Sequence, residues 1–514
     1  MTARSPLPGK SHYFYPALLT AVFLFSRGLA LAAGLRYSAI ELVWFWQVLD
    51  FDVLQHHLLR GLLHLHGQPP LYNALIGVAL KTAPDAVGWV LLGGQILLGL
   101  AAALAVYCTL IRLRLRPLIG FSIALVLMLN PSEILYEFDA LYTQLVYGML
   151  CLLAYALTCY VQLQTRRWLY VALGLGLALT LVRATYQWIW LAALCALLWW
   201  LIPEARRRTA LTSLVFIGLS LLWPLKNLVL FHHFSSSTWL PYSVGKHWKA
   251  EDPIVARWAA EGKLPTFTYS EAEGAERETE WLKTRWRAPE RGVPELDSLT
   301  KSVGGAANWN SLALLRMHEA QAKDVSFLLR HYPQPLSTDA IASIRLYFEP
   351  TSRYFLISQN EAAEQYRRLA KVTHTLDRVC CNLFGLPPDF RSDYRPADQA
   401  APKDHSTTMQ LFQRLCLGGI VLFLLVMTAL ASVAKWSLWK KNPDRRIMTI
   451  LLGWTIIWVF VVTNLVETGE NMRFRFETQA LAAIVAALFL QRLWEMGHQQ
   501  ELQPGKNVVD GAEA

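Results

Sequence analysis

Apolar runs that approach the thickness of a lipid bilayer dominate this chain. A helix needs about 20 predominantly apolar residues to cross the hydrocarbon core. Only 17% of the 514 residues are charged, whereas soluble domains carry about 25%. The sequence therefore predicts an all-α polytopic membrane protein with about ten transmembrane helices. The expected spans are 14–34, 86–111, 117–132, 138–162, 168–183, 185–202, 209–232, 409–434, 446–467 and 474–494.

Short basic loops orient these spans. With ten spans, four basic clusters fall on one side of the membrane, which the positive-inside rule makes cytoplasmic. Both termini are then cytoplasmic, and the net charge of +10 reflects topology rather than a nucleic-acid partner. We expect a bacterial inner-membrane protein because the cytoplasmic loops are compact, although the endoplasmic reticulum fits the same topology. The clusters are Arg112, Arg114 and Arg116; Arg166 and Arg167; Arg206, Arg207 and Arg208; and Lys435, Lys440, Lys441, Arg445 and Arg446.

One long polar segment divides the chain. Residues 1–232 form an N-terminal module of about seven spans, and residues 409–496 form a C-terminal module of three. The segment 233–408 is too polar to cross a membrane and predicts a mostly helical extracytoplasmic domain. Within it, "SLALLRMHEAQAKDVSFLLRHYP" places apolar residues every three to four positions, as in an amphipathic helix. We expect residues 497–514 to form a disordered cytoplasmic tail.

The first outer loop, residues 35–85, predicts two interfacial helices joined by a corner. In "VLQHHLLRGLLHL" (53–65), His56, Arg60 and His64 recur every four residues, which indicates an amphipathic helix along the membrane surface. The prolines of "HLHGQPPLYN" (64–73) end that helix, and a second begins near Pro70. His64 and His66 lie at this corner. The spacing of the four histidines in this loop is not diagnostic of zinc, so we assign no metal site.

Asp50 and Asp52 precede the first interfacial helix. Carboxylates at a membrane boundary are costly unless they are solvated, paired or functional. One of them could act as a general base on an attacking hydroxyl group. Alternatively, it could hold a divalent cation such as Mg²⁺ or Mn²⁺ against a phosphate, although no cofactor is certain. Capping of the following helix is the structural alternative.

Further carboxylates accompany the outer ends of later spans. "NPSEILYEFDALYT" (130–143) places Glu133, Glu137 and Asp139 within seven residues, and Glu133 and Glu137 share a helix face. Glu470 lies in the last outer loop, "ETGENMRFRFE". These four are additional candidate acidic residues for the site. A solvated helix start, favoured by the helix dipole, is the alternative for the first three.

Four cations lie on the outer side, against the positive-inside bias. The planar guanidinium group suits phosphate oxygens. We predict that Arg183, Lys226, Arg473 and Arg475 bind a phosphate of a lipid-linked donor. Snorkelling toward headgroups is the alternative for Lys226 and the two later arginines, and pairing with an acidic neighbour is the alternative for Arg183.

Four pieces, "LLHLHGQPPLYNALIG", "NPSEILYEFDALYT", "LVRATYQW" and "GENMRFRFETQAL", resemble the GT-C superfamily of membrane glycosyltransferases. The similarity is to the branch related to protein O-mannosyltransferases and aminoarabinose transferases. It implies inverting transfer of a sugar from a polyprenyl- or dolichyl-phosphate donor on the extracytoplasmic face. Asp50, or next Asp52, would match the first-loop base, and Arg473 and Arg475 would match phosphate-binding positions. In this interpretation His64 and His66 are candidate contacts of the sugar donor. The acids of better-known branches are often adjacent, whereas Phe51 separates these two, which leaves the base and any metal dependence open.

Two other classes of function use the same features. A transporter or flippase of lipid-linked sugars would need the arginines but no catalytic carboxylate. Charges spread through the depth of the bundle would favour transport, and the spans here are nearly free of acids. A scaffold would need only one charged surface. Membrane lipids are expected partners, and the sugar and the acceptor (protein, lipid or glycan) remain open.

Overall fold

The computed structural model describes residues 11–32, 35, 37, 41–268, 282, 284–349, 351, 417–435, 439–440 and 442–501. The structure is 77% helix, with no strand among these residues. The predicted polar segment is thus described only up to residue 351, and most of the predicted tail lies outside the described residues. The helix expected in "SLALLRMHEAQAKDVSFLLRHYP" is confirmed as α17, Leu312–His331.

A helix occupies each of the ten expected spans. Among the residues that the structure describes, six helical segments are long and apolar enough to cross a membrane, and they correspond to α1, α6, α9, α12, α24 and α25. In α7, α11 and α22 the apolar stretches are shorter, and α10 has 17 residues. The bounds are α1 Ser11–Ala32, α6 Val87–Arg112, α7 Pro117–Met128, α9 Thr143–Leu163, α10 Arg166–Val182, α11 Trp188–Leu201, α12 Arg206–Phe231, α22 Leu417–Val433, α24 Pro443–Val466 and α25 Asn471–Glu501.

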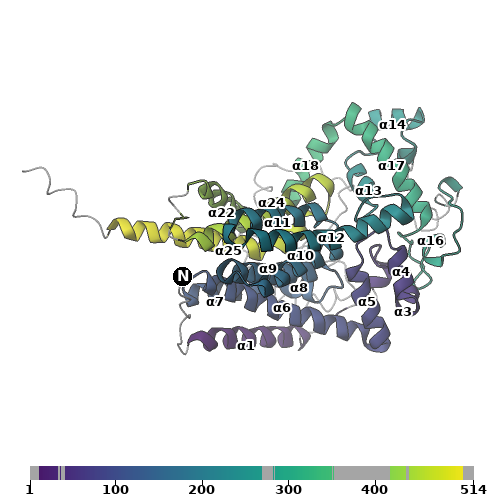
Figure 1. Cartoon of the computed structure of the whole chain (residues 1–514). Helices are drawn as coiled ribbons and strands as arrows, with labels where there is room; N and C mark the ends of the chain where they lie inside the picture. Colours follow the sequence, from purple (N-terminus) through teal and green to yellow (C-terminus); the bar gives the residue numbers. More distant parts are fainter. Residues whose placement is uncertain are drawn as a thin grey trace, which may run out of the picture.

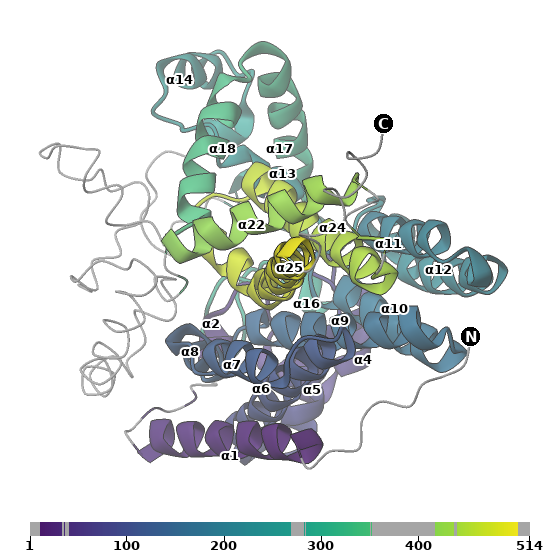
Figure 2. The same ribbon diagram turned by 90° about the vertical axis from the view of Figure 1, so that its left-hand side faces the viewer.

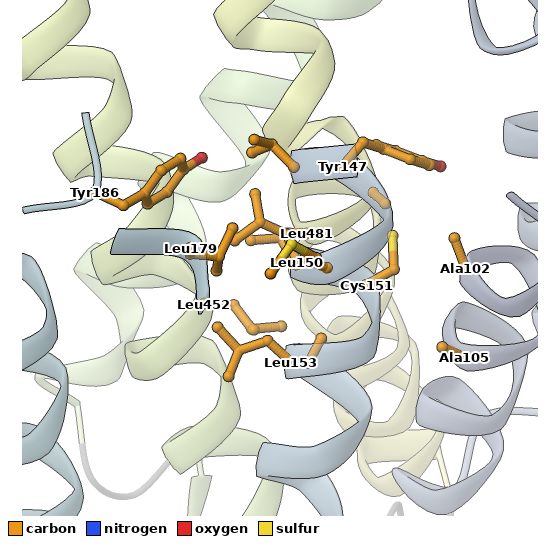
Figure 3. Close-up of a cluster of buried hydrophobic side chains, with 14 of the residues drawn as sticks. Ala102, Ala105, Tyr147, Leu150, Cys151, Leu153, Leu179, Tyr186, Leu452 and Leu481 are labelled. Atoms are coloured by element: carbon orange, nitrogen blue, oxygen red, sulfur yellow. The ribbon is translucent and has the colours of Figure 1, made fainter. Parts of the chain in front are cut away.

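Helix α9 forms the centre of the bundle. It packs against α6, α10, α24 and α25. Of the residues in its apolar 18-residue stretch, 83% are buried. Figure 3 shows Leu150 and Leu153 of α9 beside Leu452 of α24 and Leu481 of α25. An all-round apolar helix of this kind belongs in the interior. Gly148 permits close approach on the α6 side, because a Cβ there would lie 2.4 Å from Leu98 Cγ.

Shorter helices gather at one end of the bundle, on the right of Figure 1. The opposite end carries basic loops, where Arg445 Nε donates to the Leu113 carbonyl at 2.8 Å. Helix α18 joins the end group to the bundle through α24 and α25. The end group comprises α3 Phe51–His56, α4 Leu58–His64, α5 Leu71–Thr82, α13 Leu240–Gly245, α14 Pro253–Ala260, α16 Pro294–Asp297, α17 and α18 Gln334–Tyr347. The described residues also form short helices α2 Glu41–Trp44 and α8 Pro131–Glu137, and 3-10 turns Pro84–Ala86, Pro203–Ala205 and Pro265–Thr268.

The first outer loop differs from its prediction in one respect. The single amphipathic helix expected over 53–65 is two helices, α3 and α4, broken at His57 with φ −130° and ψ 34°. The break brings α4 against α3 at Gly61, where a Cβ would lie 2.5 Å from Val53 Cγ1. Tertiary packing therefore overrides the local helical pattern. The second predicted helix is present as α5, which starts directly after Pro70.

Candidate functional site: a cavity with two buried arginines

A cavity of about 410 Å³ lies where four distant parts of the chain meet. The first outer loop supplies Trp46, Gln47 and Gln68, and the α10–α11 turn supplies residues 183–185, 187 and 188. The connection from α12 to α13 and the loop from α24 to α25 complete most of the wall. Concave pockets with a few convergent polar groups are the usual place for ligand binding, so this cavity is the candidate site.

Arg183 and Arg473 are the charged centre of the cavity. Arg183 ends α10, whereas Arg473 lies in the first turn of α25, and their side chains are only 4% and 2% exposed. Both guanidinium groups lie over the ring of Tyr142, with Cζ 5.0 Å and 5.6 Å from its centre. Guanidinium groups form strong, charge-assisted hydrogen bonds with anionic groups. The structure thus brings together two of the four predicted phosphate-binding residues.

Each cation of the cavity has a carboxylate partner. Arg183 pairs with fully buried Glu477, and Arg473 Nη2 lies 2.5 Å from Glu470 Oε2. A third pair joins Lys246 Nζ to Glu467 Oε1 at 2.9 Å. Burial alone would lower the pKa of Lys246, but Glu467 outweighs it and the pKa is raised. Lys246 is therefore charged at neutral pH.

An aromatic wall faces these charged groups. Trp309 lies at its centre, with ring centres 6.1 Å from Trp46, 5.2 Å from Trp239 and 5.2 Å from Tyr242. Ser235, Ser236 and Ser237 add hydroxyl groups to the lining. Flat apolar surfaces beside hydroxyl groups suit a ligand with C–H faces and hydroxyl edges, as sugars have.

The corner "HLHGQPPLYN" positions this wall. His66 is fully buried between the Thr238 hydroxyl, 2.9 Å from Nδ1, and the Asn310 carbonyl, 3.0 Å from Nε2. Burial lowers the pKa of His66 to about 3, so its ring is neutral. Gly67 lies against Trp239, because a Cβ there would be 2.6 Å from the indole nitrogen. The next residue, Gln68, lines the cavity.

The end of the same motif anchors the acidic loop. Asn73 is 1% exposed; its Oδ1 accepts from Leu49 N at 2.8 Å and its Nδ2 donates to the Gln47 carbonyl at 3.0 Å. The Tyr72 hydroxyl donates to the Ala140 carbonyl. The motif therefore holds the segment that enters the cavity through Gln47 and continues to Asp50.

The two first-loop aspartates do not line the cavity. Asp50 caps α3, accepting from Asp52 N at 3.3 Å, which is the structural alternative given for it above. It also accepts from the backbone of Ser302 and, at 3.4 Å, from Val303 N. Asp52 is exposed, with His56 Nε2 3.9 Å from its carboxylate. Their chemical role stays a prediction.

The acids of "NPSEILYEFDALYT" are buried away from the cavity lining. Glu137 forms a two-point pair with Arg27 of α1, with both N–O distances 2.6 Å. Glu133 Oε1 accepts from Gln144 at 3.0 Å. The backbone carbonyl of Asp139 accepts from Gln95 at 2.8 Å.

The remaining predicted donor contacts also lie outside the cavity lining. Arg475 donates to the carbonyls of Tyr347 and Glu349, both at 2.8 Å, and so ties α25 to the end of α18. Lys226 donates to the Leu65 carbonyl and lies 3.7 Å from the Trp223 ring centre. His64 Nδ1 is 3.5 Å from Glu295, which also pairs with Arg60.

Several lining residues were missed from the sequence. Tyr142 closes the motif "DALYT" but was considered only as part of an acidic loop. Glu467 opens "ETGENMRFRFE", where its position at the end of a span was a usable signal. Lys246 and Trp309 belong to the polar segment in which no motif was identified, so no sequence signal singled them out.

No group of three or more His, Cys, Asp or Glu side chains arranged to hold a metal ion occurs in the part of the chain that the structure describes. Comparisons with protein-family models, with curated proteins and with solved structures gave no match.

Proposed function

We propose that the chain is a membrane glycosyltransferase that transfers a sugar from a polyprenyl-phosphate donor to an acceptor in this cavity. The main observation in support is that the buried side chains of Arg183 and Arg473 converge over the ring of Tyr142. Buried arginines at a cavity are suited to an anionic group such as the donor's phosphate. The resemblance to GT-C enzymes supplies the reaction class.

The proposed topology has ten spans, which are the six long apolar segments and, in addition, the shorter helices α7, α10, α11 and α22. Figure 1 shows the short helices at one end of the bundle and the C-terminal end of α25 at the other, and Figure 2 views the bundle from the α25 end. The basic loops lie at that second end, which the positive-inside rule makes cytoplasmic. The cavity would then open on the extracytoplasmic side, in a bacterial inner membrane, with the polar segment as an extracytoplasmic domain.

In the proposed reaction an acceptor hydroxyl attacks the sugar carbon from the side opposite the phosphate, which inverts the configuration. The bond from that carbon to the phosphate oxygen breaks and leaves a polyprenyl phosphate. Arg183 and Arg473 would stabilise the charge that develops on the leaving oxygen, while the aromatic wall would hold the sugar. A carboxylate accepts the acceptor's proton, and Asp50 and Asp52 are the candidates that the sequence predicts.

Transport of lipid-linked sugars is the second candidate, and one observation favours it. The pair of Arg27 and Glu137 lies inside the bundle, where Glu137 reaches Gly99 near the middle of α6. Charged groups at such depth are typical of translocation pathways. The pair also has a structural explanation, because it joins α1 to α8.

The two neighbouring arginines of α25 give a matched test of the proposal. Arg473→Gln removes a guanidinium group that lines the cavity. Arg475→Gln removes a guanidinium group that does not line the cavity and that donates to the Tyr347 carbonyl. Transfer of radiolabelled sugar from polyprenyl-phosphate sugar is measured in membranes of the expressing strain. The proposal predicts that Arg473→Gln raises the donor KM at least tenfold while folded Arg475→Gln stays near wild type. Equal effects of both variants, or no transfer by the wild type, would contradict it.

A further inference from the structure

A second cavity lies between three helices at the end of the bundle that carries the basic loops. Its volume is about 530 Å³, and its walls come from α7, α22 and α25 and from the residues just before α7. Figure 2 shows α7 and α22 on opposite sides of α25. Among the described residues that line it, Arg116 and Gln491 are polar and the rest are aliphatic apart from Trp494. We call this cavity the apolar groove.

The apolar groove follows α25 for about the depth of one lipid leaflet. Its lining extends from Ala483 to Trp494 of that helix, which is about 16 Å at a rise of about 1.5 Å per residue. One leaflet contributes about half of a hydrocarbon core of about 30 Å. Ala483 and Ala487 share a helix face, and their small side chains leave room along α25. The groove therefore has the length and the lining that an acyl chain requires.

The polar end of the groove is suited to the headgroup of such a lipid. Arg116 directly precedes α7, and its guanidinium carbon lies 4.4 Å from the ring centre of Trp494. Both side chains are exposed, and tryptophan is enriched at membrane–water interfaces. The N-terminus of α7 adds the positive end of a helix dipole beside Arg116. A lipid phosphate at this level would meet a cation and a helix N-terminus together.

The charges around this end favour an anionic headgroup. Arg114 and Arg116 belong to one basic loop. Glu495 of α25 does not line the groove, and it already pairs with Arg445 at 2.8 Å and with Arg492 at 3.6 Å. Basic pockets between transmembrane helices at the cytoplasmic surface are typical binding sites for anionic lipids. A zwitterionic headgroup would bring a cation of its own toward these arginines.

We propose that the apolar groove binds an anionic phospholipid of the cytoplasmic leaflet, with one acyl chain between α7 and α22 and its phosphate at Arg116. The lipid connects two parts of the fold that pack separately. Helix α7 packs against α1, α6 and α8, whereas α22 packs against α24 and α25. A bound lipid therefore stabilises the junction between the N-terminal and C-terminal modules. The choice of leaflet rests on the proposed topology, whereas the site itself does not depend on sugar transfer.

Native mass spectrometry of the purified full-length chain tests this site. The protein is titrated in detergent with phosphatidylglycerol and with phosphatidylcholine that carry the same acyl chains. We expect saturable binding of one phosphatidylglycerol molecule with about fivefold higher affinity, which corresponds to about 1 kcal/mol for one arginine. Phosphatidylglycerol should also raise the thermal midpoint more than phosphatidylcholine does, since a ligand that binds the folded state stabilises it.

Three variants separate the headgroup contact from the groove. Arg116→Gln should lower the affinity for phosphatidylglycerol about fivefold, to the level of phosphatidylcholine. Ala487→Phe fills the groove and should weaken the binding of both lipids; Ala483→Leu replaces it if that variant does not fold. Arg167→Gln is the matched control and should bind like the wild type. The Arg167 guanidinium also lies beside a tryptophan, 5.8 Å from the ring centre of Trp168, but outside the groove lining.

Equal affinity of the wild type for both lipids would overturn the proposal, as would equal losses in Arg116→Gln and Arg167→Gln. Displacement of phosphatidylglycerol by an equimolar amount of polyprenyl phosphate would overturn it by assigning the groove to the donor's chain. A wild-type dimer that Ala487→Phe dissociates would assign the groove to a second copy of the chain instead. Absence of sugar transfer would contradict the proposed function but not this site, because lipid binding is measured separately.

Discussion

The buried pair of Arg27 and Glu137 allows a quantitative test of stability. Arg27 is 2% exposed and Glu137 is not exposed at all. Arg27 Nη1 also donates to the Met128 carbonyl at 2.7 Å, and its guanidinium lies 3.9 Å from the ring centre of Phe23. These contacts join α1 to the end of α7 and to α8. The pair therefore accounts for two charges inside the bundle without any transport function.

Removing one partner should be far worse than removing both. Glu137→Gln leaves the Arg27 cation buried without its carboxylate, and the loss of one partner from a buried pair costs about 3–5 kcal/mol. The double variant Arg27→Met/Glu137→Leu removes both charges and keeps similar side-chain volumes. Replacements of whole buried pairs by apolar residues are often neutral or stabilising. We expect its stability to lie close to that of the wild type.

Thermal unfolding of the purified protein in detergent, followed by tryptophan fluorescence, measures this order. The predicted sequence of midpoints is Glu137→Gln lowest, with the double variant and the wild type together above it. Sugar transfer by the double variant should also persist, because neither residue lines the cavity. A wild-type midpoint for Glu137→Gln would refute the reasoning about burial. A stable double variant that loses function would indicate a role for these charges in translocation.

Three further predictions concern the end of the molecule that carries the cavity. Asn73→Ala should destabilise the protein by about 1–3 kcal/mol, because it leaves the Leu49 N–H and the Gln47 carbonyl without their partner; a thermal midpoint equal to that of the wild type would contradict this. Burial, and secondarily the charge of His233, lowers the pKa of His318 from 6.5 to about 3. The contribution of the neutral ring to the free energy of unfolding is therefore complete above pH 6.5 and is lost as the pH falls toward 3. His318→Phe should therefore flatten the acid side of the stability–pH profile by up to about 1.4 kcal/mol per pH unit, and an unchanged profile measured by denaturant titration would argue against a neutral buried ring. Trp309→Leu should lower kcat/KM for sugar transfer roughly tenfold, as expected for the loss of about 1.4 kcal/mol of aromatic contact, without changing the affinity for polyprenyl phosphate; equal loss of both would show that the wall does not hold the sugar.

The helices were largely predictable because their signal is local. Long apolar runs predicted the helices of the bundle, and Pro70 predicted the start of α5. The break at His57 was not predictable in this way, because it depends on packing of Gly61 against Val53. The pattern of His56, Arg60 and His64 is helical on both sides of that break. The local sequence pattern therefore does not indicate where the chain folds back.

Single residues of the candidate site were likewise predictable from local signals, whereas their arrangement in space was not. Arg183 and Arg473 could be identified singly, as cations on the outer side, but only the fold shows that they share the ring of Tyr142. Arg473 and Arg475 could have been separated from sequence, since residues two apart on a helix face different ways. Asp50 carried both a capping and a catalytic interpretation, and the structure confirms the cap. Its chemistry depends on a substrate position that sequence does not encode.

The location of a bound phosphate tests the central claim most directly. We would determine the structure by electron cryomicroscopy with polyprenyl phosphate bound to the purified wild-type protein. The account predicts phosphate density at hydrogen-bond distance from both Arg473 and Arg183, above Tyr142. Polyprenyl-phosphate density outside the cavity, at Arg475 or among the basic loops at the opposite end of the bundle, would contradict it.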